Sequence, residues 1–369
     1  MIYRVIGVMS GSSLDGLDIA CVEFQENGGK WTYDIIQADC YSYTSEWAVK
    51  LRSAASLSAE EYQLLHAEYG HYIGRRVNEF IEKNHLHYQV ALVSSHGHTT
   101  FHMPMRKMTA QLGDGAAIAA ETALPVVSDL RALDVAFGGQ GAPIVPVGER
   151  LLLGSYDLFL NIGGIANISF NAQPYIAFDV CPANRVLNML ANEAGREYDN
   201  QGNMAASGKI NQALLQKLNE LEYYLLPFPK SLANSFGTDV VYPLIQGSGC
   251  STQDALRTYV EHIIVQIINS LTTYYLRAPN RVSTERSTRL LATGGGAFNR
   301  FLIDRLRDQL GKLNIEVVVP GQDLVQYKEA MIMGFIGVLR WRQEYNVYSS
   351  VTGAERDSIN GALWIGQEA

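Results

Sequence analysis

The sequence repeats one local pattern, a strand, a glycine turn and a second strand, about half a chain apart. The turn of the first copy covers residues 10–16, and the turn of the second copy contains Gly163 and Gly164. Short apolar runs bounded by glycine turns indicate β-strands. Recurrence of the pattern at this distance favours two similar domains that face one another across a cleft. The strands expected around the two turns cover residues 3–9, 18–24, 157–161 and 166–170.

Strand and helix patterns alternate over the rest of the chain. A third β-rich run follows each copy, and segments with apolar residues at helical spacing lie between the strands. This alternation predicts an α/β fold with mixed sheets. At 369 residues the chain is also too long for one ordinary core, which agrees with two domains. The expected helices cover residues 59–84, 115–122, 183–194, 254–276, 299–310 and 327–345, and the further strands cover 31–43, 90–94, 125–128, 175–179, 289–292 and 316–319.

Charge and cysteine usage exclude several classes of function. The net charge of −8 argues against nucleic acid and against anionic membranes as partners, because neither is attracted to an acidic surface. It leaves ATP open, since a few backbone amides can hold phosphates locally. The four cysteines are scattered, so they indicate neither a zinc site nor a disulfide framework. The N-terminus lacks the apolar core of a signal peptide, and we expect a cytoplasmic protein.

Three glycine-rich segments are candidates for phosphate binding. Such loops need small residues, because several backbone N–H groups must point inward without side chains in the way. The first segment, residues 11–16, has the glycine spacing of a P-loop, but Leu17 stands where the lysine is required and a strand follows, which excludes a Walker site. The others are residues 161–164 and 293–299, the last at the expected start of a helix, where an anion is favoured. Singly each is more often a tight turn, but three in this order favour a nucleotide site.

Residues 7–18, which contain the first glycine segment, are similar to the signature of the anhydro-N-acetylmuramic acid kinases, a family of the actin/hexokinase/Hsp70 superfold. The resemblance spans nearly the whole chain and continues through residues 95–97 with His102, 138–143, 161–168, 291–299, 328–330 and 350–354. It implies duplicated actin-like ATPase domains, ribonuclease H-like in topology, with mixed β-sheets flanking a nucleotide cleft. Domain I is then expected at 1–145 plus about 340–369, and domain II at 146–339.

The resemblance also implies an activity. Members of the family hydrolytically open the 1,6-anhydro ring of their sugar and phosphorylate O6 with ATP, giving N-acetylmuramic acid 6-phosphate for peptidoglycan recycling. An aspartate in a segment Phe-Asp-x-Gly-Pro-Gly-Asn is taken as the base that activates water, and Asp179 matches it here. Asp15 and Asp18 are expected to hold Mg²⁺ through water, because hard cations prefer carboxylate and water oxygens.

The remaining site residues are expected on two sides of the cleft. Substrate contacts are predicted for His96, Asp129, Arg131 and Glu329, although Asp129 and Arg131 also fit a simple surface ion pair. A metal site at the histidines near residue 96 is disfavoured, because no further fixed ligand lies near in sequence. ATP binding is predicted for Gly11, Ser12, Ser13, Leu14, Asp15, Gly16, Leu17, Asp18, Gly163, Gly164, Gly294, Gly295 and Gly296.

Two departures from the family pattern leave the sugar open. Cys181 and Ala183 replace the two glycines of the segment around Asp179. The family also carries Pro-Lys-Ser-Thr-Gly-Arg-Glu, whereas residues 232–235 follow Ser231 here without the Arg-Glu pair. The alternatives are a related kinase of another amino sugar, or a non-catalytic nucleotide-binding protein of the Hsp70 or actin kind. We expect a homodimer whose ligands are a small amino sugar and ATP, with no nucleic-acid or membrane partner.

Overall fold

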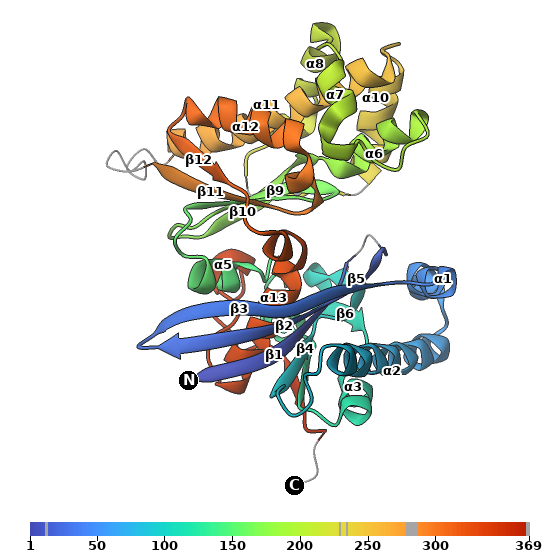
Figure 1. Cartoon of the computed structure of the whole chain (residues 1–369), viewed down its shortest axis with the longest axis vertical. Coiled ribbons are helices and arrows are strands. Elements are labelled where there is room, and N and C mark those ends of the chain that lie inside the picture. Colours follow the sequence, from blue (N-terminus) through green and yellow to red (C-terminus); the bar gives the residue numbers. More distant parts are fainter. Residues whose placement is uncertain (12–13, 229, 234, 278–286, 367–369) are drawn as a thin grey trace. The chain divides into compact units, whose positions relative to one another are not determined.

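The computed structural model describes every residue except 12–13, 229, 234, 278–286 and 367–369, and it divides into two compact units (Figure 1). Unit 1 contains Met1–Gly154 and Tyr327–Ala369, and unit 2 contains Ser155–Gln326. These boundaries differ from the expected ones near residues 145 and 340. A buried ion pair shows why: Glu149 of α5 (Pro146–Leu152) accepts from Lys328 of α13 (Gln322–Trp341) at 2.8 Å, so both elements belong with unit 1 at these positions.

Unit 1 is built on a six-stranded sheet with the order β13-β7-β4-β1-β2-β3. The first three strands in the chain form an antiparallel meander, and β4 and β7 extend it in parallel from β1. The short strand β13 pairs antiparallel with β7 and forms the edge. The bounds are β1 (Ile2–Ser10), β2 (Gly16–Asn27), β3 (Lys30–Ser42), β4 (Leu92–Ser95), β7 (Val126–Ser128) and β13 (Ala362–Trp364).

Helices pack on both faces of this sheet. The capping box of Ser58 and Glu61 begins α2 (Ala59–Lys83), whose buried residues at helical spacing pack with Ile6 and Val8 of β1. On the other face, Phe335 of α13 contacts Phe24 of β2 with ring centroids 5.3 Å apart. A side chain at Gly7 would overlap the backbone of α13, so glycine permits this close approach. The other elements are α1 (Ser45–Ser53), α3 (Gly115–Thr122), α4 (Ala132–Ala136), α14 (Ser349–Thr352) and the hairpin β5 (His98–Met103)–β6 (Met108–Leu112).

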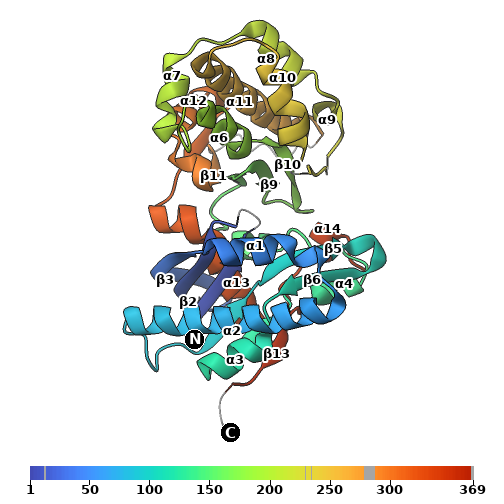
Figure 2. The same ribbon diagram turned by 90° about the vertical axis from the view of Figure 1, so that its right-hand side faces the viewer.

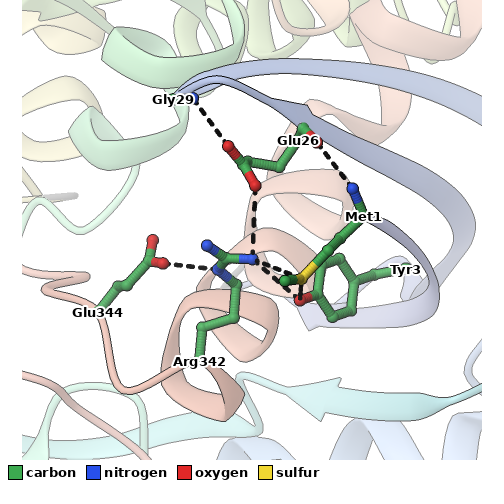
Figure 3. A network of polar contacts seen from close by, with 6 residues as sticks. All are labelled: Met1, Tyr3, Glu26, Gly29, Arg342 and Glu344. Atoms are coloured by element: carbon green, nitrogen blue, oxygen red, sulfur yellow. Dashed lines mark hydrogen bonds and ion pairs between the residues drawn. The ribbon is translucent and has the colours of Figure 1, made fainter.

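Arg342, just after α13, ties this helix to the meander (Figure 3). Its guanidinium donates to the Tyr3 hydroxyl at 3.0 Å and to Glu344 at 2.6 Å, and it lies 3.7 Å from a carboxylate oxygen of Glu26. The N-terminal ammonium group of Met1 donates to the Glu26 backbone carbonyl at 2.8 Å. The C-terminal end of α13 is therefore fastened to β1 and to the β2–β3 hairpin.

Unit 2 repeats the topology of unit 1 with a five-stranded sheet in the order β10-β9-β8-β11-β12. β9 is antiparallel to β8 and β10, while β11 is parallel to β8 and β12. Without the edge strand β13, the spatial order in unit 1 is β3-β2-β1-β4-β7, which matches β10-β9-β8-β11-β12 in unit 2. In both sheets the second strand in chain order is antiparallel to its neighbours. This is the ribonuclease H-like arrangement. The expected duplicated α/β fold is thus confirmed. The bounds are β8 (Leu158–Ile162), β9 (Ile165–Phe170), β10 (Ile176–Pro182), β11 (Thr288–Thr293) and β12 (Ile315–Val318).

The helices of unit 2 gather on the same side of its sheet in both views (Figures 1 and 2). The central one, α11 (Thr252–Arg277), buries Tyr259, Ile263 and Ile267 in a continuous apolar core. The others are α6 (Asn184–Glu193), α7 (Asn203–Ser207), α8 (Gln212–Asn219), α9 (Glu222–Leu225), α10 (Tyr242–Gln246) and α12 (Arg300–Gly311).

Most sequence-based element bounds agree with the structure to within a few residues, but the last long helix does not. It was expected at 327–345, whereas α13 begins five residues earlier, at Gln322, directly after Pro320 and Gly321. The hairpin β5–β6, the edge strand β13 and the short helices α7 to α10 were not expected at all. Within the described residues, none of the helices is long and apolar enough to cross a membrane.

Candidate functional site

The first glycine turn of unit 1 connects β1 to β2. Leu14 has a φ of 58°, in the left-handed region, and the Gly16 N–H donates to a carboxylate oxygen of Asp15 at 3.0 Å. A side chain at Gly16 would overlap the Cys40 sulfur, so glycine is required where β2 begins. Leu17 and Asp18 lie within β2 itself rather than in the turn. Ser12 and Ser13 lie outside the described residues. Gly11 stands between the end of β1 and these two residues.

A buried hydrogen-bond chain fixes the end of β1 just before this turn. The Ser10 hydroxyl lies 2.8 Å from the Tyr43 hydroxyl and 3.1 Å from Nδ1 of His98. Tyr43 in turn contacts the hydroxyl of Tyr69 on α2 at 2.6 Å. Satisfied polar networks of this kind hold their members in one geometry. The sequence did not predict these contacts of His98 and Tyr43, because they join residues far apart in the chain.

The carboxyl group of Asp18, next to the turn, has a raised pKa. Burial raises the pKa of Asp18 to about 6, and the negative charges of Asp15 and Glu329 contribute to the increase. A cation would relieve this repulsion, so the donor set fits Mg²⁺ chemically. Among the described residues, however, no three carboxylate, imidazole or thiol groups lie close enough together to hold a metal ion directly. Coordination of Mg²⁺ through water by Asp15 and Asp18 stays a prediction.

Two of the expected substrate residues form a bonded pair in unit 1. Arg131 donates from Nε to Nε2 of His96 at 2.8 Å and from Nη1 to the Gly141 carbonyl at 2.6 Å. Nδ1 of His96 lies 2.8 Å from the Gly97 carbonyl, so this nitrogen carries the proton. Burial, with the nearby charge of Arg131, lowers the pKa of His96 to about 3. His96 is therefore neutral at physiological pH and orients the guanidinium.

Asp129 and Arg131 do not form the simple ion pair that the sequence left open. In the described part of the chain Asp129 instead accepts from the Ser128 hydroxyl at 2.7 Å. Its φ of 56° places a non-glycine residue in the left-handed region, a conformation that costs free energy and is concentrated at functional sites. Glu329 lies on α13 and acts electrostatically on both Arg131 and Asp18. The structure thus brings Arg131, Glu329 and Asp18 into one electrostatic neighbourhood.

The loop at residues 138–143 is held by a buried aspartate that the sequence did not single out. Asp134 accepts from the Gly141 N–H at 2.8 Å and from the Thr352 hydroxyl at 2.7 Å. Gly139 packs so closely on Asp134 that a side chain there would overlap its carboxylate. Because the Gly141 carbonyl accepts from Arg131, Asp134 fixes the position of the arginine indirectly.

In unit 2 the second and third glycine segments lie against each other. Side chains at Gly294 and Gly296 would overlap Asn161 and Ile162 at the end of β8, which explains the need for glycine at both positions. Gly294 has a φ of 79°, and its N–H donates to the Val325 carbonyl at 3.3 Å. The third segment leads directly into a helix as expected, since it ends at Asn299 and α12 begins at Arg300. A short helical turn at Gly295–Phe298 lies within the segment, and Asn299 caps α12.

The turn at Gly163 and Gly164 meets the N-terminus of α6. The Asn184 N–H donates to the Gly163 carbonyl at 3.0 Å, and the Ala183 N–H donates to the Gly164 carbonyl at 2.8 Å. The Asn184 side chain also donates to the Ile162 carbonyl at 2.9 Å. The open space at Gly163 and Gly164, where an added Cβ meets no atom closer than 3.4 Å, leaves the backbone of the turn accessible to a ligand.

A pocket of about 460 Å³ opens beside these glycines within unit 2. This volume falls within the usual range for small-molecule sites. Its wall combines Leu187, Tyr198 and Phe298 with several amide side chains that can hydrogen-bond a heterocycle and a sugar. The sequence missed Gln322 and Gln326 because it placed the start of α13 too late. The amide-bearing residues are Asn184, Asn188, Asn200, Gln201, Asn299, Gln322 and Gln326.

Asp179 lies in β10 at a β-bulge, three residues before the strand ends. One carboxylate oxygen accepts from the Leu232 N–H at 2.9 Å, and the Asp179 N–H donates to the Lys230 carbonyl at 3.0 Å. Burial raises the pKa of the Asp179 carboxyl, and the bond from Leu232 lowers it by a smaller amount. A half-buried carboxylate with a raised pKa is a stronger base than an exposed one, as proton abstraction requires.

Lys230 and Tyr223 complete the surroundings of Asp179, and the sequence assigned neither. The Lys230 ammonium donates to the Tyr223 carbonyl at 3.0 Å and lies 4.5 Å from the centre of the Tyr223 ring. Burial lowers the pKa of Lys230. Leu232, which directly follows Ser231, also donates to the Asp179 carboxylate, so the segment that departs from the family pattern contacts Asp179.

Comparisons with known proteins identify the family. The family model for anhydro-N-acetylmuramic acid kinase matches residues 3–366. The anhydro-N-acetylmuramic acid kinase of Hydrogenovibrio crunogenus is 33% identical, with 97% of each chain covered. The enzymes of the same name from Haemophilus influenzae and Xylella fastidiosa are 31% and 34% identical, and each match covers 97% of this chain and at least 95% of the relative. The chain belongs to the anhydro-N-acetylmuramic acid kinase family.

Proposed function

We propose that this protein is an ATP-dependent kinase that hydrolytically opens the 1,6-anhydro ring of anhydro-N-acetylmuramic acid and phosphorylates O6. The product is N-acetylmuramic acid 6-phosphate, an intermediate of peptidoglycan recycling. The family match over residues 3–366 supports the substrate and the reaction. The structural observation that carries the mechanism is the half-buried Asp179 with its raised pKa, held from the backbone by Leu232.

The reaction joins a hydrolysis to a phosphoryl transfer. Water adds to C1 of the sugar, the bond from C1 to the bridging O6 breaks, and O6 attacks the γ-phosphorus of ATP. The bond from that phosphorus to the ADP oxygen breaks, and the products are the sugar phosphate, ADP and a proton. Asp179 accepts the proton of the attacking water, a step that its raised pKa favours. The rest of the barrier is lowered by positioning and charge neutralisation.

The nucleotide is assigned to the glycine segments. In unit 2, the pocket beside Gly295 and Gly296 has the size and the amide side chains to take the adenosine, and the open turn at Gly163 and Gly164 is suited to phosphates. In unit 1, the turn from Gly11 to Asp18 is proposed to contribute further phosphate contacts. Mg²⁺ would neutralise phosphate charge when held through water by Asp15 and Asp18, whose surroundings favour a cation.

In unit 1, His96, Asp129, Arg131 and Glu329 are proposed to bind the sugar, and in unit 2 Asp179 is proposed as the catalytic base. The neutral His96 and the guanidinium of Arg131 offer oriented polar groups, and Asp129 has the strained backbone of a functional position. We further propose a homodimer that works in the cytoplasm, which sedimentation and cell fractionation would test. The comparisons do not favour a non-catalytic nucleotide-binding role.

A coupled ADP-release assay over matched sugars tests this function. We expect turnover with 1,6-anhydro-N-acetylmuramic acid, and much less with N-acetylmuramic acid, whose ring is already open. Phosphorus NMR should show a phosphate monoester at C6 of the product. Turnover of ordinary hexoses without turnover of any anhydro sugar would contradict the ring-opening reaction, and a related anhydro amino sugar as the best substrate would revise its specificity.

A further inference from the structure

Arg185, beside the glycine turn of unit 2, has a buried Nε atom without a hydrogen-bond partner among the described residues. It occupies the first turn of α6, directly after Asn184, which lines the 460 Å³ pocket. In the part of unit 2 that the structure describes, the ion pairs do not include Arg185. A buried guanidinium nitrogen that is left unsatisfied costs free energy, so a bound ligand is the natural acceptor.

The guanidinium runs along the turn itself. A Cβ built on Gly164 would lie 3.9 Å from both the Cβ and the Nε of Arg185. The backbone N–H of Arg185 donates to the Gly164 carbonyl at 3.4 Å. The positive end of the α6 dipole reinforces the field of the side chain at this place. The first backbone N–H groups of α6 are already bonded, because those of Asn184 and Arg185 donate to the Gly163 and Gly164 carbonyls. The Arg185 side chain and the open glycine turn are therefore the groups that favour an anion here.

We propose that Arg185 binds the γ-phosphoryl group of the nucleotide and stabilises its charge during transfer. This inference rests on the proposed kinase function and adds a catalytic residue to it. The guanidinium keeps its proton throughout and takes part only by hydrogen bonding and charge. Its planar fork matches two phosphoryl oxygens at once, which the ammonium group of a lysine cannot do.

The position of Arg185 favours a phosphoryl group over other anions. Its neighbour Asn184 touches the pocket assigned to adenosine on one side and the carbonyls of the glycine turn on the other. Phosphates that extend from that pocket toward the turn pass along Arg185. The guanidinium is therefore placed to bind the γ-phosphoryl group during transfer. Charge develops on this group, and a preorganised donor lowers the barrier most there.

Nucleotide binding, measured by calorimetry with Mg²⁺ and without sugar, tests the assignment. For Arg185→Met we expect the affinity for a non-hydrolysable ATP analogue to fall about 10- to 100-fold, as for a lost charge-assisted bond. The affinities for ADP and AMP should change by less than about threefold, within the range of an indirect effect. Arg289→Met is the matched control, because Arg289 is the second residue of β11, near the end of that strand opposite to Gly294, and pairs with Glu316. It should leave all three affinities unchanged.

Turnover adds a second readout. We expect kcat of Arg185→Met to fall about 100-fold, and Arg185→Lys to recover only part of the loss, because a lysine restores charge but not the fork. Thermal unfolding should show no loss of stability in Arg185→Met, since its buried Nε has no hydrogen-bond partner to lose among the described residues. If methionine still prevented folding, the lysine variant would carry the binding comparison.

Several results would overturn the inference. Equal losses for ADP and for the ATP analogue would move the contact to the β-phosphate. Unchanged nucleotide binding with a weakened affinity for the sugar would make Arg185 a sugar-binding residue. Absence of turnover with any anhydro sugar in the wild type would contradict the proposed function alone, because the nucleotide comparison does not depend on the sugar.

Discussion

The hydroxyl group of Tyr223 donates a hydrogen bond to the backbone carbonyl of Asp179 at 2.7 Å. The same tyrosine accepts from Lys230 through its own carbonyl, and Lys230 accepts from the Asp179 N–H. Together with the bond from Leu232 to the carboxylate, these contacts fasten Asp179 to the segment from 223 to 232 at a bulge, where the β-ladder is interrupted. The proposed base is thus positioned by tertiary contacts rather than by its strand alone.

Removing the Tyr223 hydroxyl should make the position of Asp179 less well defined without changing nucleotide binding. For Tyr223→Phe we expect kcat to fall about three- to tenfold, the effect of one lost hydrogen bond of about 1 kcal/mol. The KM for ATP should not change, because two of the glycine segments lie elsewhere in unit 2 and the third belongs to unit 1. Tyr242→Phe is the control, since the Tyr242 hydroxyl contacts Glu193 and not Asp179. An unchanged kcat in Tyr223→Phe would show that the backbone holds Asp179 in place without this bond.

Replacing Asp179 itself separates base catalysis from binding. Asp179→Asn keeps the shape and can still accept from Leu232, but it cannot take a proton. Turnover should fall by about two to four orders of magnitude, while affinities for ATP and sugar stay near those of the wild type. Steady-state kinetics and calorimetry check the two halves of this statement. Near-normal turnover would remove Asp179 from the mechanism and make Glu329 the next candidate.

The pH dependence of the wild type should report the same group. A base must be deprotonated to work, and burial raises the pKa of Asp179. Activity should therefore fall with decreasing pH at a higher pH than it would for an exposed aspartate. In the residual activity of Asp179→Asn this acid limb should be missing. A profile of kcat/KM for the sugar, measured with saturating ATP and Mg²⁺, makes the comparison. An identical acid limb in both proteins would assign it to another group.

The sequence predicted those parts of the fold and site that are local. The two strand-turn-strand copies, the three glycine segments and the place of Asp179 in the chain can each be identified from a short stretch of sequence. The duplicated topology followed from the recurrence of the strand-turn-strand pattern. Tyr223 was missed because it meets Asp179 across 44 positions, and no periodicity encodes such a contact. Gln322 and Gln326 were missed although Pro320 and Gly321 signal a helix start directly before them. Arg185 could be recognised only once the absence of a partner for its buried nitrogen was visible.

Burial of Asp18, with repulsion from Asp15 and Glu329, should make its negative charge lower the stability of the protein although the proposed function uses that charge. Folding raises the pKa of this carboxyl from 3.8 to about 6, so the folded state binds the proton more tightly than the unfolded one. The stability associated with that proton is present at low pH and is lost as pH rises from about 4 to about 6. Asp18→Asn removes the charge, and we expect it to stabilise the protein by about 2 kcal/mol at pH 8. At pH 4 the advantage should vanish, while Mg²⁺-dependent turnover should be impaired at every pH. Thermal unfolding at the two pH values, without Mg²⁺, checks the sign, and a variant less stable than wild type at pH 8 would contradict it.

The buried pair of Lys328 and Glu149 offers a last test, because it joins the two chain segments of unit 1 near the point on α13 where the second segment begins. Their side chains are 6% and 4% exposed, and the ammonium lies 2.8 Å from the carboxylate. Lys328→Met would leave the Glu149 charge buried without this cation, and we expect a loss of about 3–5 kcal/mol in the free energy of unfolding. In the double variant Lys328→Met with Glu149→Leu the uncompensated charge is gone, so most of that loss should be recovered. Denaturant unfolding of the two single variants and the double variant measures the coupling. If the double variant were as unstable as the sum of the single ones, the two side chains would act independently, and α5 would not be anchored to α13 by their attraction.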